Sequence, residues 1–317
     1  MAMIKIGRDI ENFMRIKAID TFRGLSIVLM VFFTIISVLS NSLPWLLTHN
    51  IAGTLRPGDF VLPMFLFASG MSLVFFQKKR EKLKRNQYFL DVIERFGKFV
   101  LIWFFLSPFS AGEFLGIDEV MLCCLLFLTT VVLIRFTDNE IIIAALLIFG
   151  VYFVLQAFGV LPDFTQHYLG GFGAAIFYLP VMLAGVLAGR NVNGTKGMVL
   201  PVLVLAGLLV VLVPPYKSIA SPSFMALSVL VSLVIFDLCK QIKFEPLEYL
   251  GRTPIRYWVL MYVLIGIPIV LYASITKILL ELDWPVATVS ALSVMVILYA
   301  VSKIFDMIKE RIQIVPG

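Results

Sequence analysis

The chain has 317 residues, of which 60% are hydrophobic and only 15% are charged, and its formal net charge is +6. A soluble domain carries about 25% charged residues and about 45–50% apolar ones. One water-exposed domain cannot bury this excess of apolar side chains, so the composition excludes an ordinary soluble protein and predicts that lipid covers much of the surface.

Ten apolar runs follow one another along the chain, and each is predicted to be an α-helix because lipid offers no partner to unpaired backbone groups. The runs are Gly24–Leu43, Phe60–Gln77, Phe99–Ala111, Val120–Ile134, Ile141–Leu161, Phe172–Gly189, Gly197–Val213, Ser223–Phe236, Tyr257–Thr276 and Trp284–Ser302. The expected fold class is therefore all-α, a polytopic bundle of about ten transmembrane helices. We expect one transmembrane domain (24–302) between a cytoplasmic N-terminal segment (1–23) and a cytoplasmic tail (303–317).

The basic residues predict the orientation of this bundle. With ten spans, 23 of the 26 Lys and Arg residues fall on the side of both termini, and only Arg56, Lys217 and Lys277 fall on the other. Cytoplasmic loops of membrane proteins carry the excess of Lys and Arg. Both termini are thus predicted to be cytoplasmic in a multi-pass protein of the cell membrane. The bilayer accounts for the positive charge, so no nucleic-acid partner is expected, and a homodimer is left open.

The apolar runs contain no Asp, Glu, Lys, Arg or His in their interiors. Proton-coupled carriers usually have such residues at mid-membrane, so this class is disfavoured, and acid–base chemistry is expected near a membrane face. A facilitative or sodium-coupled transporter of a small organic solute stays open as an alternative. The three cysteines lack the spacing of a metal site, so no metal is expected. Gly185 and Gly189 have the G-x-x-x-G spacing of close helix packing.

The sequence has two histidines, His49 and His167, and both fall in predicted outer loops. His49 lies in an unusually apolar segment, residues 44–58, and Asp59 follows ten residues later at the outer end of the second run. A neutral imidazole can take a proton from an attacking amine or hydroxyl. A carboxylate on the other ring nitrogen can fix its tautomer. An interfacial histidine with an unrelated Asp at a helix end is the alternative that spacing leaves open.

Two segments carry a resemblance to a known family. Residues 15–30 read RIKAIDTFRGLSIVLM, and residues 59–70 read DFVLPMFLFASG, with His49 between them. In this order they resemble the signature of the heparan-alpha-glucosaminide N-acetyltransferase family, and residues 170–190 are similar to its later small-residue helix. Residues 251–261 resemble its C-terminal motif, with Thr253 and Met261 in place of Asn and His.

The resemblance implies an acyltransferase that moves an acetyl group from cytoplasmic acetyl-CoA, its co-substrate, to an amine or hydroxyl of an extracytoplasmic sugar, lipid or polymer. His49 matches the family's essential histidine, and Asp59 is its expected partner. Because CoA carries several phosphate charges, we expect it to bind on the basic side, with Arg23, Arg252 and Arg256 as candidates. Helix anchoring is the alternative role for these arginines, and a non-catalytic relative is a further alternative for the chain.

Overall fold

The structure is a computed structural model that describes residues 17–40, 42–48, 55–80, 85–106, 119–158, 171–215, 221–276 and 281–314. Within these ranges the regular elements are helices and no strand occurs, which confirms the all-α fold class. The longer helices are α2 (Lys17–Leu39), α3 (Val61–Arg80), α4 (Arg85–Leu106), α5 (Glu119–Leu133), α6 (Asp138–Ala157), α8 (Gly171–Arg190), α9 (Thr195–Leu212), α10 (Pro222–Cys239) and α14 (Trp284–Ile314). The shorter ones are η1 (Trp45–Leu47), η2 (Pro57–Phe60), η4 (Val192–Gly194), α11 (Glu245–Arg252), α12 (Pro254–Met261), η5 (Tyr262–Gly266) and α13 (Ile267–Thr276).

Each of the ten apolar runs overlaps a helix of this structure. In the described part of the chain, six helical segments are long and apolar enough to cross a membrane. They are Lys17–Leu39, Pro57–Arg80, Asp138–Ala157, Val192–Leu212, Pro222–Cys239 and Trp284–Arg311. Shorter apolar helices are Leu122–Leu133, Ile176–Arg190 and Pro254–Ile269. The membrane class is supported, while a total of about ten spans and their orientation stay predictions.

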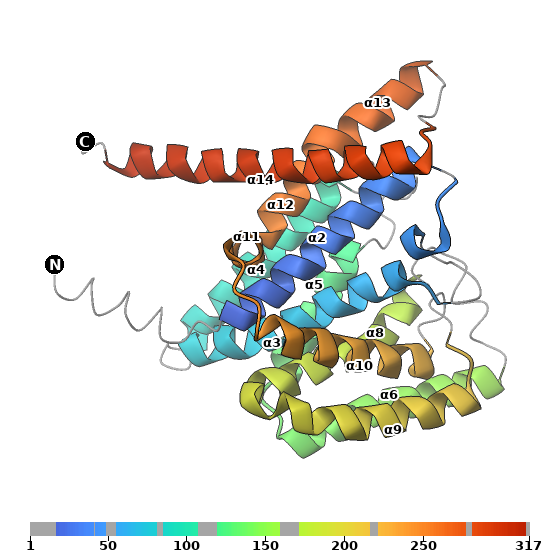
Figure 1. The fold of residues 1–317 in the computed structure, drawn as a ribbon. Coiled ribbons are helices and arrows are strands. Elements are labelled where there is room, and N and C mark those ends of the chain that lie inside the picture. The colour runs from blue at the N-terminus through green and yellow to red at the C-terminus, as the bar shows by residue number, and fades with distance from the viewer. Residues whose placement is uncertain are drawn as a thin grey trace.

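Helix α2 joins two hydrophobic clusters of the bundle. Its first part contributes Phe22 to a cluster with α3, α8 and α10, and its later part contributes Ile27 and Val31 to a cluster with α12 and α14. Figure 1 shows α14 on one side of α2, and α6 and α9 on the opposite side of the molecule, beyond α8 and α10. The N-terminal signature therefore lies in the centre of the bundle.

Helices α3 and α8 pack with their backbones in contact. A Cβ atom on Gly70 would lie 2.1 Å from the carbonyl oxygen of Met182, and one on Gly185 would lie 2.2 Å from that of Phe67. A Cβ on Gly189 would meet the Cα of Met71 at 2.9 Å. Because only glycine fits at these distances, the close packing predicted from the G-x-x-x-G spacing is confirmed.

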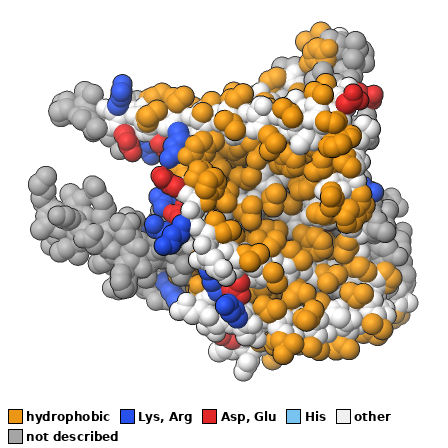
Figure 2. All heavy atoms as spheres, in the orientation of Figure 1, with side chains coloured by type: hydrophobic (Ala, Val, Ile, Leu, Met, Phe, Trp, Pro, Cys, Tyr) orange, Lys and Arg blue, Asp and Glu red, His pale blue; other side chains and the backbone are white. Residues whose placement is uncertain are grey.

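Charged side chains gather along one edge of the face in Figure 2, while apolar side chains cover most of the rest. Helix α2 begins at this edge and α14 ends there (Figure 1). We call it the basic end. Helix α3 places Lys78, Lys79 and Arg80 in its last turn, and α8 ends at Arg190. An apolar surface with charges at its border is the pattern expected where lipid is the solvent.

Candidate functional site

Two glycines at the basic end allow α2 and α11 to cross in direct backbone contact. A Cβ atom on Gly24 would lie 1.9 Å from the carbonyl oxygen of Leu247, and one on Gly251 would lie 1.8 Å from that of Asp20. Any larger residue at either position would force the two helices apart. The crossing brings the residues that follow Gly251 against the first turns of α2.

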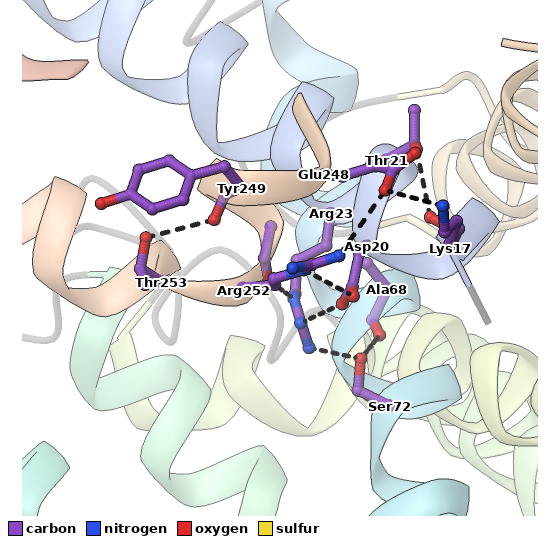
Figure 3. A network of polar contacts seen from close by, with 11 residues as sticks. Lys17, Asp20, Thr21, Arg23, Ala68, Ser72, Glu248, Tyr249, Arg252 and Thr253 are labelled. Atoms are coloured by element: carbon purple, nitrogen blue, oxygen red, sulfur yellow. Dashed lines mark hydrogen bonds and ion pairs between the residues drawn. The ribbon is translucent and has the colours of Figure 1, made fainter. Parts of the chain in front are cut away.

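Asp20 is the centre of the polar cluster that this crossing creates (Figure 3). Its side chain is only 6% exposed, and one carboxylate oxygen accepts a hydrogen bond from Arg23 Nη2 at 2.7 Å. The other oxygen lies 3.7 Å from Arg252 Nε. A buried carboxylate needs such partners because burial removes the water that would otherwise stabilise its charge. The cluster thereby ties the first helix to a segment more than 200 residues later.

Each of the three guanidinium nitrogens of Arg23 donates a hydrogen bond within the protein. Its Nε donates to the carbonyl of Gly251, and Nη1 donates to Ser72 Oγ at 2.8 Å, in addition to the bond from Nη2 to Asp20. The side chain is 19% exposed. These contacts join α2, α3 and α11 at one point, so helix anchoring accounts for the position of Arg23. None of them tests CoA binding, which stays a prediction for this residue.

Arg252 is more open than Arg23. Its side chain is 42% exposed, and Nη2 lies 3.6 Å from Glu248 Oε2, which is longer than a hydrogen bond. Glu248 also lies 4.0 Å from the ammonium of Lys17. The loose ion pairs leave N–H groups of Arg252 free to turn toward a ligand at the basic end.

Arg256 belongs to a different set of contacts. Its Nη1 lies 2.5 Å from Asp306 Oδ1 on α14, and the same carboxylate accepts a hydrogen bond from the Tyr249 hydroxyl at 2.7 Å. That hydroxyl also lies 2.9 Å from Ser302 Oγ. The structure therefore brings Arg23 and Arg252 together around Asp20, whereas it ties Arg256 to α14.

Asp59 lies at the other end of α3, in η2, and is 1% exposed. Its Oδ2 accepts a hydrogen bond from the backbone N–H of Arg56 at 2.9 Å, which caps the turn that leads into α3. The Arg56 side chain in turn donates to Thr48 Oγ1. His49 lies outside the described residues, so the expected pairing of His49 with Asp59 stays a prediction.

Several residues of the Asp20 cluster were not predicted as site residues from the sequence. Asp20 and Arg23 stand three residues apart, a spacing that brings side chains together on a helix, and this signal was available. Ser72 and Glu248 carry no comparable signal, because their role depends on the crossing of distant helices. Thr253, which the resemblance predicts to stand in place of the family's Asn, donates from Oγ1 to the Tyr249 carbonyl at 3.3 Å at the end of α11.

The two regions meet one candidate span, Pro57–Arg80, at different points: Asp59 lies near its start, and the Asp20 cluster contacts it at Ser72. Thirteen residues separate Asp59 from Ser72, which corresponds to about 20 Å along a helix. Among the residues that the structure describes, no group of three His, Cys, Asp or Glu side chains could hold a metal ion. The described parts of the site therefore offer cations and a carboxylate at separate points along this candidate span.

Comparison with known proteins identifies the family of the chain. The family model described as "Heparan-alpha-glucosaminide N-acetyltransferase, catalytic" matches residues 15–196. The match covers more than half of the 317-residue chain, and it includes Asp20, Arg23 and Asp59 but ends before Arg252 and Arg256. A search of curated proteins finds no match. The match over residues 15–196 shows that the chain belongs to the heparan-alpha-glucosaminide N-acetyltransferase catalytic family.

Proposed function

We propose that this protein is a membrane-bound acyltransferase of the cell membrane. It moves an acetyl group from cytoplasmic acetyl-CoA to an amine or hydroxyl of an extracytoplasmic sugar, lipid or polymer. Both termini and the basic end face the cytoplasm, because Lys and Arg are retained on that side. The bilayer, acetyl-CoA and the acceptor are its partners, and a pair of chains as a homodimer is compatible with the reaction.

The observation that carries this proposal is the layout of α3 in a chain that belongs to this family. The candidate span Pro57–Arg80 carries the buried carboxylate of Asp59 near its start, and thirteen residues later its Ser72 contacts Arg23 of the arginine cluster. An enzyme that takes its donor from one side and its acceptor from the other needs recognition groups at both ends of such a span. Cations suit the donor end, because CoA is a polyanion that cannot enter lipid.

At the outer end, His49 is the proposed catalytic residue. In its neutral form it takes the proton from the acceptor amine or hydroxyl, or it carries the acetyl group itself. Asp59 orients the imidazole through the ring nitrogen that does not react. The hydrogen bond of Thr48, the neighbour of His49, to Arg56 supports this role, because Arg56 lies only three residues before Asp59.

At the basic end, the residues fit a phosphate-bearing donor in different ways. Arg252 is the proposed direct phosphate contact, because its side chain is exposed and its ion pairs are loose. Arg23 acts beside it, holding the crossing of α2 and α11 in place while its charge adds to the field at the phosphates. Arg256 lies in the first turn of the next helix, α12, where it pairs with Asp306 and adds a further positive charge near the basic end.

The test is acetyl transfer by purified protein in liposomes, with radiolabelled acetyl-CoA and a panel of amino sugars and polyol lipids. We expect His49→Ala to lower the rate by about 10²–10⁴-fold if histidine is the base. A greater loss is expected if histidine carries the acetyl group, because the two-step route then closes. His167→Ala is the matched control, since it removes the other histidine of the chain, and it should keep full activity.

Two outcomes would overturn the proposal. Equal rates for wild-type protein and His49→Ala would remove the mechanism. No labelled product from any acceptor would remove the activity, and solute uptake by the same liposomes would then assign the chain as a facilitative or sodium-coupled transporter. Absence of both would assign a non-catalytic relative.

A further inference from the structure

A narrow apolar pocket that is open on one side lies between α2, α3, α4, α5 and α12. Its lining consists of Ile27, Met30, Phe65, Phe99, Ile102, Cys123, Pro254, Ile255 and Trp258. These side chains offer carbon and sulfur surface and no strong hydrogen-bond donor or acceptor, apart from the indole N–H of Trp258. The pocket therefore suits a hydrocarbon chain.

The same lining disfavours the pantetheine arm of CoA as the occupant. That arm contains two amide groups, and burying an amide without a hydrogen-bond partner is unfavourable. A hydrocarbon chain has no such groups and gains free energy as its surface is covered. The pocket is thus distinct in its chemistry from the polar route that the acetyl donor requires.

The pocket is continuous with the apolar outer surface of the bundle. Ile255 lines it and is 38% exposed, whereas Trp258, one turn further along α12, is only 6% exposed. In a membrane protein, an exposed apolar surface of this kind faces lipid chains. A chain that enters past Ile255 from the bilayer would pass from the outer surface to the buried face of Trp258.

Arginines stand one helical turn before the pocket, on the side of the basic end. Arg95 precedes the lining residue Phe99 by four residues on α4, and Arg23 precedes Ile27 by four residues on α2. Four residues of helix correspond to about 6 Å. A ligand with its hydrocarbon chain in the pocket would therefore have its head group at the level of these arginines.

Arg95 is the arginine best suited to bind that head group. Its guanidinium stacks over the Phe76 ring at 4.1 Å, and within the described ranges it donates no hydrogen bond. Arg80 stacks on the same ring at 4.0 Å but is bound to Asp91 at 2.5 Å. Arg95 is repelled by the charges of Arg80 and Arg23, and it is attracted by Asp91 and by Glu94. An added anion would relieve this repulsion.

We propose that the pocket binds one hydrocarbon chain of an anionic membrane phospholipid, and that Arg95 holds the lipid phosphate. Guanidinium and phosphate form charge-assisted hydrogen bonds, and the leaflet at the basic end supplies the lipid without a path through water. The lipid site takes no part in acetyl transfer, so measurements of lipid binding alone test it.

The experiment uses Trp258 as an internal reporter, because its side chain lines the pocket. The other three tryptophans are replaced (Trp45→Phe, Trp103→Phe and Trp284→Phe), and the full chain is placed in phosphatidylcholine vesicles. Phosphatidylglycerol or phosphatidylcholine with brominated chains is then added, since bromine quenches indole fluorescence on contact. We expect half-maximal quenching at about a fivefold lower mole fraction of phosphatidylglycerol, the preference that one basic side chain near a membrane surface confers.

Two variants test whether Arg95 causes the preference for phosphatidylglycerol. Arg95→Gln should remove it, so that both lipids quench alike. Lys98→Gln is the matched control, because it takes the same charge from α4 at a side chain that is 65% exposed and paired with Glu94, and it should keep the preference. If the triple tryptophan variant does not fold, native mass spectrometry of the wild-type chain and of the two variants measures retention of the two lipids instead.

Several results would overturn the proposal. Equal quenching by the two lipids in the wild-type pocket, no quenching by either, or an unchanged preference in Arg95→Gln would each do so. Relief of quenching by palmitoyl-CoA in a protein without phospholipid preference would assign the pocket to an acyl donor. All these outcomes are read without acetyl-CoA turnover, so they are independent of the proposed acyltransferase activity.

Discussion

The two regions along α3 use charge in different ways. Toward the basic end, Ser72 accepts a hydrogen bond from Arg23, which also pairs with Asp20, in a cluster that joins three helices far apart in the sequence. At the other end, Asp59 accepts a hydrogen bond from the N–H of Arg56, which is its own neighbour in the chain. The first arrangement joins distant helices, whereas the second caps the turn by which the chain enters α3.

This difference separates stability from activity. Loss of a buried, cross-helix charge leaves unpaired ions and disturbs the packing of the whole bundle. Loss of a local cap affects one turn. Substitutions at the basic end should therefore change stability first, and substitutions near Asp59 should change turnover first. The predictions below test this contrast, from the largest expected effect on stability to the smallest.

Asp20→Ala should have the largest effect on stability. It leaves Arg23 and Arg252 without their shared carboxylate, and breaking a buried pair in this way typically costs about 3–5 kcal/mol. Asp138→Ala is the matched control, because its carboxylate is 62% exposed in its pair with Arg190, and it should cost at most about 1 kcal/mol. Thermal unfolding in detergent compares the two. Equal losses would mean that the cluster does not hold the helices together.

Gly24→Ala should come next. Its Cβ would lie 1.9 Å from the Leu247 carbonyl oxygen, so α2 and α11 must separate, at a cost of about 1–3 kcal/mol for overpacking. Gly207→Ala makes the same change on α9 where nothing lies within 4 Å, and it should be neutral or stabilise by up to about 1 kcal/mol. The same unfolding assay distinguishes them. An undiminished unfolding temperature for Gly24→Ala would contradict the close crossing.

A substitution at Asp59 should affect turnover more than stability. Asp59→Asn keeps an oxygen acceptor for the Arg56 N–H, so its loss of stability should be smaller than that of Gly24→Ala. Without its charge it orients the imidazole poorly, and the acetyl-transfer rate should fall by about tenfold or more. Asp283→Asn, at an exposed Asp just before α14, is the control and should keep its rate. A destabilised Asp59→Asn protein with normal turnover per folded molecule would make Asp59 a cap only.

Helix positions were predictable from sequence because lipid forces apolar segments of this length to be helical. The ends of the helices were less predictable. Helix α4 begins at Arg85, fourteen residues before the apolar run at Phe99, and α14 continues to Ile314, beyond the run that ends at Ser302. In both cases the helix extends into mixed polar sequence, where hydropathy gives no signal.

The candidate site was predictable in its local parts only. The pairing of Asp20 with Arg23 follows from their spacing on one helix. The approach of Arg252 to Asp20 depends on the Gly24–Gly251 crossing, and a single sequence does not report which glycines meet. The roles of His49 and Asp59 were inferred from their chemistry and spacing and from the family resemblance. Family membership is shown, and the pairing of the two side chains stays a prediction.

Arg252→Gln should have the smallest effect on stability and a selective effect on the donor. Its ion pairs, at 3.6 and 3.7 Å, involve a side chain that is 42% exposed, so their loss should cost less than about 1 kcal/mol. A lost phosphate contact should raise the KM for acetyl-CoA by about tenfold or more, with kcat at saturation nearly unchanged.

Lys17→Gln is the control for this last change. Its ammonium is 75% exposed and also lies near Glu248, so it removes one positive charge from the same cluster without removing a guanidinium. If only the overall positive charge of the basic end attracted CoA, both variants would raise the KM for acetyl-CoA by the same amount. That rise would be smaller than the rise expected from loss of a direct phosphate contact. A large rise in KM that is confined to Arg252→Gln identifies Arg252 as a direct ligand. High salt should then raise the KM of the wild type more than that of Arg252→Gln, because screening weakens a contact only where the charge is present.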